Sequence, residues 1–193
     1  VEKLQSPLLQ PATELEKASW QGRRFRFAVD RASTVKGSGT VVTGSVFNGI
    51  VKWGDKVVIS PAGSSARVRD IQKDGTRCDR AVTGERCALN LAGIELRQVR
   101  RGDWVMDARL HAPTHRVDVE FQLLADEKNA LRHWTPVHVH LGTRGVTGRI
   151  ALRKSGAMEP GHRGFAQLVF DQPIAALHGD YFVCPDQSAR RTV

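Results

Sequence analysis

Hydrophobic and polar side chains alternate in short runs along most of the chain. In the first clear run, Phe25, Phe27 and Val29 alternate with Arg26 and Ala28. A period of two is typical of a β-strand with one face buried and the other in solvent. The run therefore predicts a half-buried strand.

We expect this first strand to lead into Asp30-Arg31 and to end there, with further strands about every ten residues. Turns that contain glycine separate them, such as Asn48-Gly49, because Asn-Gly accepts positive φ at low cost. Between Asp74-Gly75 and Gly84 the pattern indicates a turn followed by a linker. The expected strands lie at 39–46, from 51 onward, and at 56–60, 66–71, 86–91 and 104–106. Short strands with glycine turns at this spacing predict an all-β sandwich or barrel.

A change of composition at Arg109–Thr114 divides the chain, and a second series of strands follows it. These strands are expected at 116–124, 137–141, 146–152, 164–170 and 181–183. The sequence thus predicts two β domains, 23–110 and 111–193. Residues 1–22 contain helix formers interrupted by Pro7 and Pro11, and they resemble the tail of another element.

Composition and charge narrow the class of protein. The chain has 193 residues and a net charge of +9, and basic residues are spread along it without a run of five. A soluble domain this basic often binds a polyanion, although a solvated basic surface without a partner is the alternative. No apolar run reaches the roughly 18 residues of a membrane span, and no signal peptide is evident. We therefore expect no membrane partner.

Cysteine usage indicates the compartment. Cys78, Cys87 and Cys184 make an odd count, and none of them forms a C-x-x-C pair. A disulfide framework or a zinc knuckle is not expected from this spacing. A reducing, cytoplasmic environment fits these cysteines best.

The glycine-rich stretch VKGSGTVVTGSV at 35–46 invites comparison with a phosphate-binding loop. Gly39 and Gly44 reproduce G-x-x-x-x-G, but Ser45 and Val46 stand where the motif needs Lys and Ser or Thr. The four residues between the glycines are all β-branched, which favours an extended strand. A dinucleotide-binding fingerprint also fails, since Val42 replaces its last glycine and no helix-forming run follows.

The order of motifs resembles the second domain of the translational GTPases, a β-barrel that follows their GTP-binding (G) domain. In that family a segment G-x-G-T-V-x-T-G is a barrel strand, and its glycines permit bending and close backbone approach. The motifs are the Asp-Arg pair at 30–31, VKGSGTVVTG at 35–44, Gly54-Asp55, ARVRDIQ at 66–72, TGERCALNL at 83–91 and RRGDWV at 100–105.

Within that superfamily the chain is similar to the selenocysteine-specific elongation factors from about Phe25 to Val193. The marks are FRFAVDR at 25–31, GERCALNL at 84–91, HVHLGT at 138–143, VTGRI at 146–150 and DQSARRT at 186–192. Pro185 stands where the family usually has an Arg before the last motif. The resemblance implies an all-β fold of two consecutive β-barrels, of domain II type at 23–110 and of domain III type at 111–193. It implies that 1–22 is the tail of a G domain and a linker.

The parts that bind GTP are not in this sequence. It has no G-x-x-x-x-G-K-[ST], no Asn-Lys-x-Asp and no Asp-x-x-Gly. We therefore expect no catalytic residue, cofactor or metal site here, and no enzyme activity of this part alone. The resemblance implies that GTP and Mg²⁺ bind the G domain before Val1. It also implies that the mRNA recoding hairpin is bound by a region after Val193.

The resemblance implies that the protein delivers selenocysteinyl-tRNA to the ribosome for UGA recoding, and that Asp30, Arg31 and Arg86 line the pocket for the aminoacyl end. A selenol ionises more readily than a thiol, so this cargo carries an anion at neutral pH, whereas a guanidinium stays positively charged. Two unit charges ~4 Å apart attract by about 4 kcal/mol at an effective dielectric constant of about 20. A net half of that gives on the order of 30-fold preference over serine.

Other readings of these three residues stay open. Asp30 either orients an arginine or accepts from the α-amino group of the cargo. Simpler readings are a surface ion pair with Arg31, and an exposed strand charge for Arg86.

The resemblance further implies that the tRNA body meets the second barrel through phosphate contacts, which position the RNA without reading sequence. Each basic residue taken alone is more simply a solvated charge. The candidates are Arg144, Arg149, Arg153, Lys154, Arg163, Arg190 and Arg191.

Two further groups are interpreted as structural. His138 and His140 alternate on one strand, but a metal site needs more ligands than this pair. The four tryptophans are expected to pack rather than to stack on bases. They are Trp20, Trp53, Trp104 and Trp134.

Three alternatives to the main hypothesis remain. One is a domain II and III piece of an elongation factor Tu-like or initiation factor gamma-like protein, against which Asp30-Arg31 with Arg86 argues. Another is a β-barrel hydrolase, for which no Ser/His/Asp spacing is present. The third is a purely structural module that docks a G domain.

Overall fold

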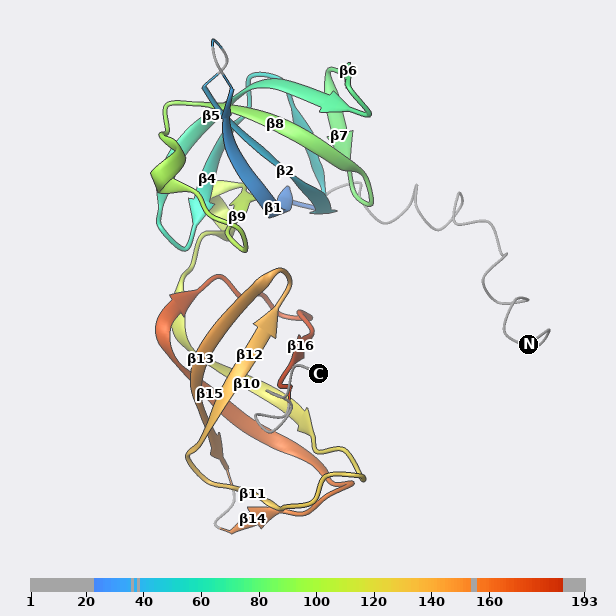
Figure 1. The fold of residues 1–193 in the computed structure, drawn as a ribbon, viewed down its shortest axis with the longest axis vertical. Helices are drawn as coiled ribbons and strands as arrows, with labels where there is room; N and C mark the ends of the chain where they lie inside the picture. Colours follow the sequence, from blue (N-terminus) through green and yellow to red (C-terminus); the bar gives the residue numbers. More distant parts are fainter. Residues whose placement is uncertain (1–22, 36, 38, 154–155, 186–193) are drawn as a thin grey trace, which may run out of the picture. The chain divides into compact units, whose positions relative to one another are not determined.

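The chain folds as two compact β units that divide between His111 and Ala112. The computed structural model describes residues 23–35, 37, 39–153 and 156–185. Figure 1 shows that almost all of the regular structure in this part is strand. The all-β prediction is confirmed. The expected helical segments at 2–9 and 13–19 lie outside the described residues.

The first unit is a closed antiparallel barrel. Six strands follow the order β4-β9-β1-β2-β8-β5, and β5 pairs with β4 again to close the ring. Closure leaves few free edges that could pair with another chain. The strands are β1 (Arg26–Val35), β2 (Gly39–Asn48), β3 (Ile50–Lys52), β4 (Lys56–Ser60), β5 (Ser64–Lys73), β6 (Thr76–Arg77), β7 (Arg80–Val82), β8 (Arg86–Ala92) and β9 (Trp104–Met106). Two single turns of 3-10 helix also occur, η1 (Leu96–Gln98) and η2 (Ala108–Leu110).

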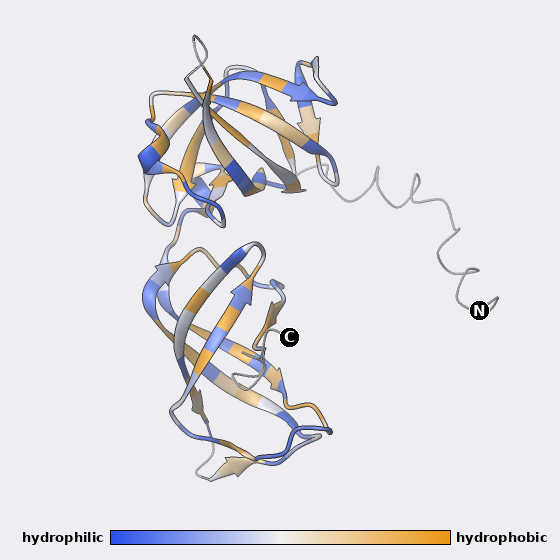
Figure 2. Ribbon diagram, viewed as in Figure 1, coloured by the Kyte–Doolittle hydropathy of each residue, from blue (hydrophilic) through white to orange (hydrophobic). Residues whose placement is uncertain are grey.

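The core of this barrel includes Phe27 and Val29, two of the alternating positions that the sequence pattern predicted to be buried. Phe27, Val29, Val42, Ile59 and Leu89 are among its fully buried side chains. Figure 2 shows hydrophobic and hydrophilic residues alternating along the same strands. Burial of one face of each strand therefore explains the period of two in the sequence.

The first strand departs from the prediction in two ways. Arg26 and Ala28, which were expected on the open face, are buried. The Arg26 guanidinium carbon lies 3.6 Å from the centre of the Trp104 ring, so the indole covers that face of the strand. The strand also continues past Asp30-Arg31 to Val35.

The region expected to be a linker contains two short strands. β6 pairs with the end of β5, and β7 pairs with β3 in a separate two-stranded ribbon. Ala81 in β7 is fully buried against the barrel core. The prediction of a linker was wrong because strands of two or three residues are too short to show a period.

The second unit is an antiparallel half-barrel of five strands in the order β10-β15-β13-β12-β16, with a small β11–β14 ribbon. Its core includes Phe121, Val139, Ile150 and Leu168. Its strands are β10 (Thr114–Gln122), β11 (Leu131–Arg132), β12 (Thr135–Leu141), β13 (Arg144–Leu152), β14 (Ala157–Met158), β15 (Arg163–Ile174) and β16 (Phe182–Val183). In the described ranges no helix is long and apolar enough to cross a membrane.

Of the three tryptophans that the structure describes, one is buried. Trp104 is buried and packs edge-on against Phe47, as expected of a packing residue. Trp53 is 68% exposed and Trp134 is 46% exposed, so the prediction that these two pack was wrong. Trp20 lies outside the described residues.

Candidate functional site

A β-bulge in β1 places two neighbouring charged residues on the same side of the strand. Val29 pairs with Gly44 and Arg31 pairs with Thr43, so Asp30 is an extra residue without its own partner on β2. In a regular strand Asp30 and Arg31 would point to opposite faces, but a bulge re-aims the side chains around it. Both residues line one hollow on the outside of the barrel.

Gly44 allows the strands to approach closely at this bulge. A Cβ atom at Gly44 would lie 1.8 Å from the Ala28 carbonyl oxygen and 3.0 Å from Cζ of Phe27. Gly44 also pairs with Cys87 on its other side, so it joins β1 to β8. The glycine-rich stretch is therefore a barrel strand, and its last glycine is required by contact with β1.

The hollow crosses the outer surface from the β5–β6 hairpin to the turn before β9. Its volume is about 560 Å³. It brings together the three residues predicted for the aminoacyl pocket, from β1 and β8. Its lining consists of Asp30, Arg31, Thr43, Gln72, Asp74, Gly75, Arg86, Cys87, Ala88 and Arg101.

Within the hollow, Asp30 and Arg86 form an ion pair and a hydrogen bond from Nη1 of Arg86 to Oδ2 of Asp30. The alternative reading, an ion pair of Asp30 with Arg31, is not the one observed in the described part of the chain. Asp30 thus orients a guanidinium across β2, which is one of its two predicted roles. The side chain of Arg86 remains 64% exposed, so a ligand can reach it.

Arg101 also lines the hollow, although it was not among the residues predicted from the sequence. Its turn is tied to β1 by hydrogen bonds from Gly102 N to Val29 O, 2.9 Å, and from Val29 N to Asp103 O, 3.0 Å. Arg31 and Arg101 form no ion pair with any carboxylate in the described ranges. Asp74, which has a φ of 49°, lines the same hollow on the β5–β6 turn. The pair Arg100-Arg101 before Gly102 was the available signal, but nothing in the sequence places it beside Asp30.

The strand that carries Arg86 is anchored on both sides of it. Glu85 accepts from Nζ of Lys73 at 2.8 Å and from the backbone N–H of Val82 at 2.8 Å. Burial raises the pKa of the Cys87 thiol to about 12, so this side chain is a neutral packing group. These contacts hold Arg86 at a fixed place on the hollow's wall.

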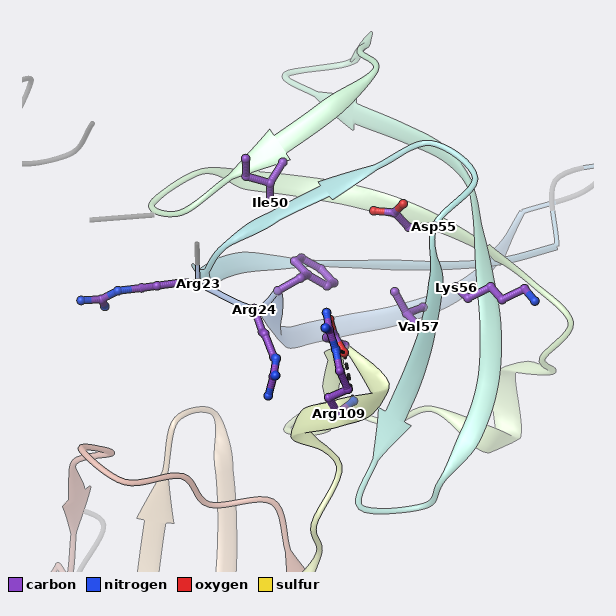
Figure 3. A pocket seen from close by; sticks show the side chains of 9 residues that line it. Arg23, Arg24, Ile50, Asp55, Lys56, Val57 and Arg109 are labelled. Atoms are coloured by element: carbon purple, nitrogen blue, oxygen red, sulfur yellow. Dashed lines mark hydrogen bonds and ion pairs between the residues drawn. The ribbon is translucent and has the colours of Figure 1, made fainter. Parts of the chain in front are cut away.

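A second hollow of about 500 Å³ lies elsewhere on the first unit, as Figure 3 shows. This hollow was not predicted from the sequence. Arg109 donates to Asp107 through Nε at 2.9 Å and through Nη2 at 2.6 Å. These bonds hold the pKa of the Asp107 carboxyl at about 2, below its ordinary value. The residues that line this second hollow are Arg23, Arg24, Phe25, Ile50, Asp55, Lys56, Val57, Asp107 and Arg109.

The structure spreads the predicted phosphate-binding residues of the second unit along strands β13 and β15. Arg144 begins β13, Arg149 lies within it, and Arg153 follows its end. Arg149 donates to the carbonyl of Trp134 at 3.2 Å. Arg163 is held by Glu120 through an ion pair of 2.6 Å, which reduces the charge it offers to a ligand. Lys154, Arg190 and Arg191 lie outside the described residues.

His138 and His140 stack on each other, with ring centres 4.9 Å apart. In the described residues no group of three or more His, Cys, Asp or Glu side chains is placed to hold a metal ion. A Cβ atom on Gly145 would lie 2.6 Å from Nε2 of His138, so the two rings pack over that glycine.

Two family models match the chain, one for each unit. Residues 39–106 match elongation factor Tu domain 2, and residues 114–193 match the β-barrel domain of the selenocysteine-specific elongation factor.

Curated relatives extend this similarity over both units. The selenocysteine-specific elongation factor of Escherichia coli K12 is 38% identical over 194 residues, which cover 100% of this chain and 29% of that protein. The protein of the same description from Desulfomicrobium baculatum is 36% identical and matches 88% of this chain and 27% of its own length. Elongation factor 1-alpha of Metallosphaera sedula is 35% identical over 66% of this chain and 29% of that protein. The chain thus spans less than a third of these relatives.

A solved structure agrees with the sequence comparisons. The crystal structure of a bacterial selenocysteine-specific elongation factor, EF-Sec, has a TM-score of 0.74 and 30% identity to this chain. The match covers 97% of this chain and 30% of that one.

Proposed function

Because the chain belongs, through both of its β units, to the selenocysteine-specific elongation factors, we propose that it is the part of such a factor that holds selenocysteinyl-tRNA for delivery to the ribosome. The family resemblance seen in the sequence and the prediction of two barrels of the translational GTPase type are confirmed. Delivery to the ribosome and recoding of UGA are activities of a complete factor, and we propose them for the protein that contains this chain.

The observation that carries the proposal is the hollow on the first unit. Asp30, Arg31 and Arg86 come from two strands separated by β2, and they line one hollow of about 560 Å³. A hollow lined by exposed guanidinium groups favours an anionic ligand group. We propose that the selenocysteine side chain and the 3′ end of the tRNA bind there.

The charges in the hollow suggest different tasks for the arginines. Arg86 is already paired with Asp30, so its guanidinium is oriented and partly neutralised. Arg31 forms no ion pair in the described part of the chain, so it offers an uncompensated positive charge to the selenolate. A serine side chain is neutral and gains little from that charge. We propose that Arg31 and the Asp30–Arg86 pair act together to favour selenocysteine.

The other partners follow from the same family. We propose that the tRNA backbone meets the second unit at the exposed Arg149 and Arg153, and at Arg144. Lys154, Arg163, Arg190 and Arg191 remain candidates for the same role. GTP and Mg²⁺ would bind a G domain of the same protein, and the mRNA hairpin would bind another region. Work on the ribosome would place the protein in the cytoplasm.

The test compares selenocysteinyl-tRNA with seryl-tRNA in a full-length factor that carries this chain behind its G domain. We expect the wild type to prefer the selenocysteinyl form on the order of 30-fold, a net attraction of about 2 kcal/mol. Arg31→Ala and Arg86→Ala should each remove most of that preference, while Arg31→Lys should keep part of it because the charge remains.

A matched control is Arg97→Ala. Arg97 is an exposed arginine of the same unit, paired with Glu95 at 2.8 Å and outside the hollow. The Arg97→Ala variant should leave the preference for selenocysteinyl-tRNA over seryl-tRNA unchanged. If both Arg31→Ala and Arg86→Ala discriminate as well as the wild type, the hollow is not the selenocysteine pocket.

A second candidate is a factor that carries ordinary aminoacyl-tRNA, because elongation factor 1-alpha matches two thirds of the chain. The same measurement decides between them, since such a factor would bind both charged tRNAs equally.

A further inference from the structure

Trp53 presents its indole to solvent on a turn that is firmly held. The turn joins β3 to β4, and the side chain is 68% exposed. Asp55 accepts from the Lys52 backbone N–H at 2.8 Å, and Gly54 N donates to Val68 O at 2.8 Å. Trp53 N donates to Asp79 O at 3.0 Å. A fixed backbone displays a large aromatic ring where burial would otherwise be favourable.

Two pairs of like charges flank this turn. Lys52 lies directly opposite Arg80 across β3 and β7. Lys56 lies directly opposite Arg67 across β4 and β5. All four side chains are exposed, and none forms an ion pair with a carboxylate in the described residues. Like charges directly opposite each other on antiparallel strands destabilise the pairing, so each pair costs stability unless an anion lies across it.

The guanidinium of Arg67 lies beside the turn itself. Its Nη1 donates to the Gly54 carbonyl oxygen at 3.4 Å, next to Trp53 in the chain. Two carboxylates are near, but Asp55 is engaged with the turn and only Asp79 is exposed. Trp53 with Lys52, Lys56, Arg67 and Arg80 is called the Trp53 surface below. Positive charge dominates it.

We propose that the Trp53 surface binds a single-stranded segment of RNA, with one base stacked on the indole and phosphates lying across the two cation pairs. Aromatic rings stack on any base, and basic residues beside them follow the backbone. This combination of an exposed indole with unpaired cations matches single-stranded nucleic acid better than an acidic protein, which offers no flat rings at regular spacing.

The surface is separate from the hollow of Asp30 and Arg31, since the two share no residue. Lys56 also borders the second hollow, and in Figure 3 its side chain points away from Arg24 and Arg109. RNA binding at the Trp53 surface can therefore be tested independently of the proposed aminoacyl pocket.

The test uses the full 193-residue chain and a dye-labelled oligouridylate of about ten nucleotides, with binding followed by anisotropy. Trp53→Ala should weaken binding by at least about fivefold, because stacking contributes about 1–3 kcal/mol per base. Trp53→Phe should stay close to the wild type because it keeps an aromatic face. Tyr181→Ala is the matched control, since Tyr181 is also an exposed aromatic residue but lies in the other unit.

The contribution of the two cation pairs is measured separately, through the dependence of RNA binding on salt concentration. Lys56→Ala combined with Arg67→Ala should lower the slope of log K against log salt by up to about 1.4, because each phosphate contact to a single strand contributes about 0.7. The same variant should melt at an unchanged or higher temperature, since a repulsion is removed. A residue with only a structural role would show the opposite change in stability.

Two results would overturn the proposal. The first is binding of the oligouridylate by Trp53→Ala as tight as by the wild type. The second is displacement of the RNA by polyglutamate of equal charge, with Trp53→Phe as weak as Trp53→Ala, which would assign the surface to an acidic protein. Arg97→Ala, outside both hollows, should bind the oligouridylate normally, and Trp53→Ala should keep the wild-type preference for selenocysteinyl-tRNA in the full-length factor, so failure here is distinguishable from failure of the aminoacyl pocket.

Discussion

Substitution of Gly44 by alanine tests how closely the first unit's strands must approach at the candidate pocket. Gly44 lies on β2 between Val29 of β1 and Cys87 of β8. The added Cβ would lie 1.8 Å from the Ala28 carbonyl oxygen, about 1.6 Å short of the 3.4 Å at which ordinary contact begins. The clashing atom belongs to the backbone, so it cannot rotate away.

The magnitude follows from this geometry. Overpacking a well-filled site costs about 1–3 kcal/mol, and we expect about 3 kcal/mol here because a strand must shift. For a unit of this size each 1 kcal/mol lowers the melting temperature by roughly 4–8 °C, which gives a loss of roughly 12–24 °C. The bulge at Asp30 depends on the same approach, so the proposed selection for selenocysteine should fall together with the stability.

Gly39→Ala, on the same strand, is the matched control. Gly39 has a φ of 85° and nothing within 4 Å of its added Cβ. Its cost is therefore only the left-handed backbone, about 1–2 kcal/mol. Urea denaturation of the two variants measures the difference. Equal midpoints would show that β2 has room for a side chain at Gly44 and that the close approach is not what the strand requires.

Three further predictions concern the same unit. Since the folded pKa of Asp107 lies at about 2, below the ordinary value, its pair with Arg109 stabilises the fold above about pH 4, and this contribution is lost as the pH falls towards 2. Asp107→Asn should remove part of that pH dependence from an acid unfolding curve, and the change should be small because Arg109 is exposed; an unchanged curve would contradict the pairing. Burial raises the pKa of the Cys87 thiol to about 12, so iodoacetamide at pH 8 should label this thiol only after unfolding. Mass spectrometry measures the labelling, and prompt labelling of the native protein would refute the burial of Cys87. Trp104→Ala should destabilise the unit by about 3–5 kcal/mol in urea, because the indole is buried and covers Arg26, and a loss below about 1 kcal/mol would exclude that role.

Much of the fold follows from the sequence because a long alternation of hydrophobic and polar residues arises when one face of a strand is buried. Phe27 and Val29 lie on the predicted buried face of the first strand, and both are fully buried. The order of the motifs also identified the family correctly. The two-residue and three-residue strands β6 and β7 were not predicted, because such short segments carry no period.

The candidate site was only partly accessible from the sequence. Asp30, Arg31 and Arg86 were selected through the family resemblance, and the structure brings them to one hollow. The partner of Asp30 was not foreseen, because the bulge that turns Asp30 towards Arg86 arises from pairing with β2. Arg101 joins the hollow only through the bonds of its turn to Val29.

By itself the sequence determined the class of fold, the family and many of the buried positions, since these depend on residue types at local spacing. Only the tertiary structure decided which charges meet and which side chains stay in solvent. Arg26 is covered by an indole 78 residues away along the chain, and Trp53 is left exposed beside two pairs of facing cations. Such outcomes depend on register and closure between distant strands, and the energy of each contact exists only once those strands are paired.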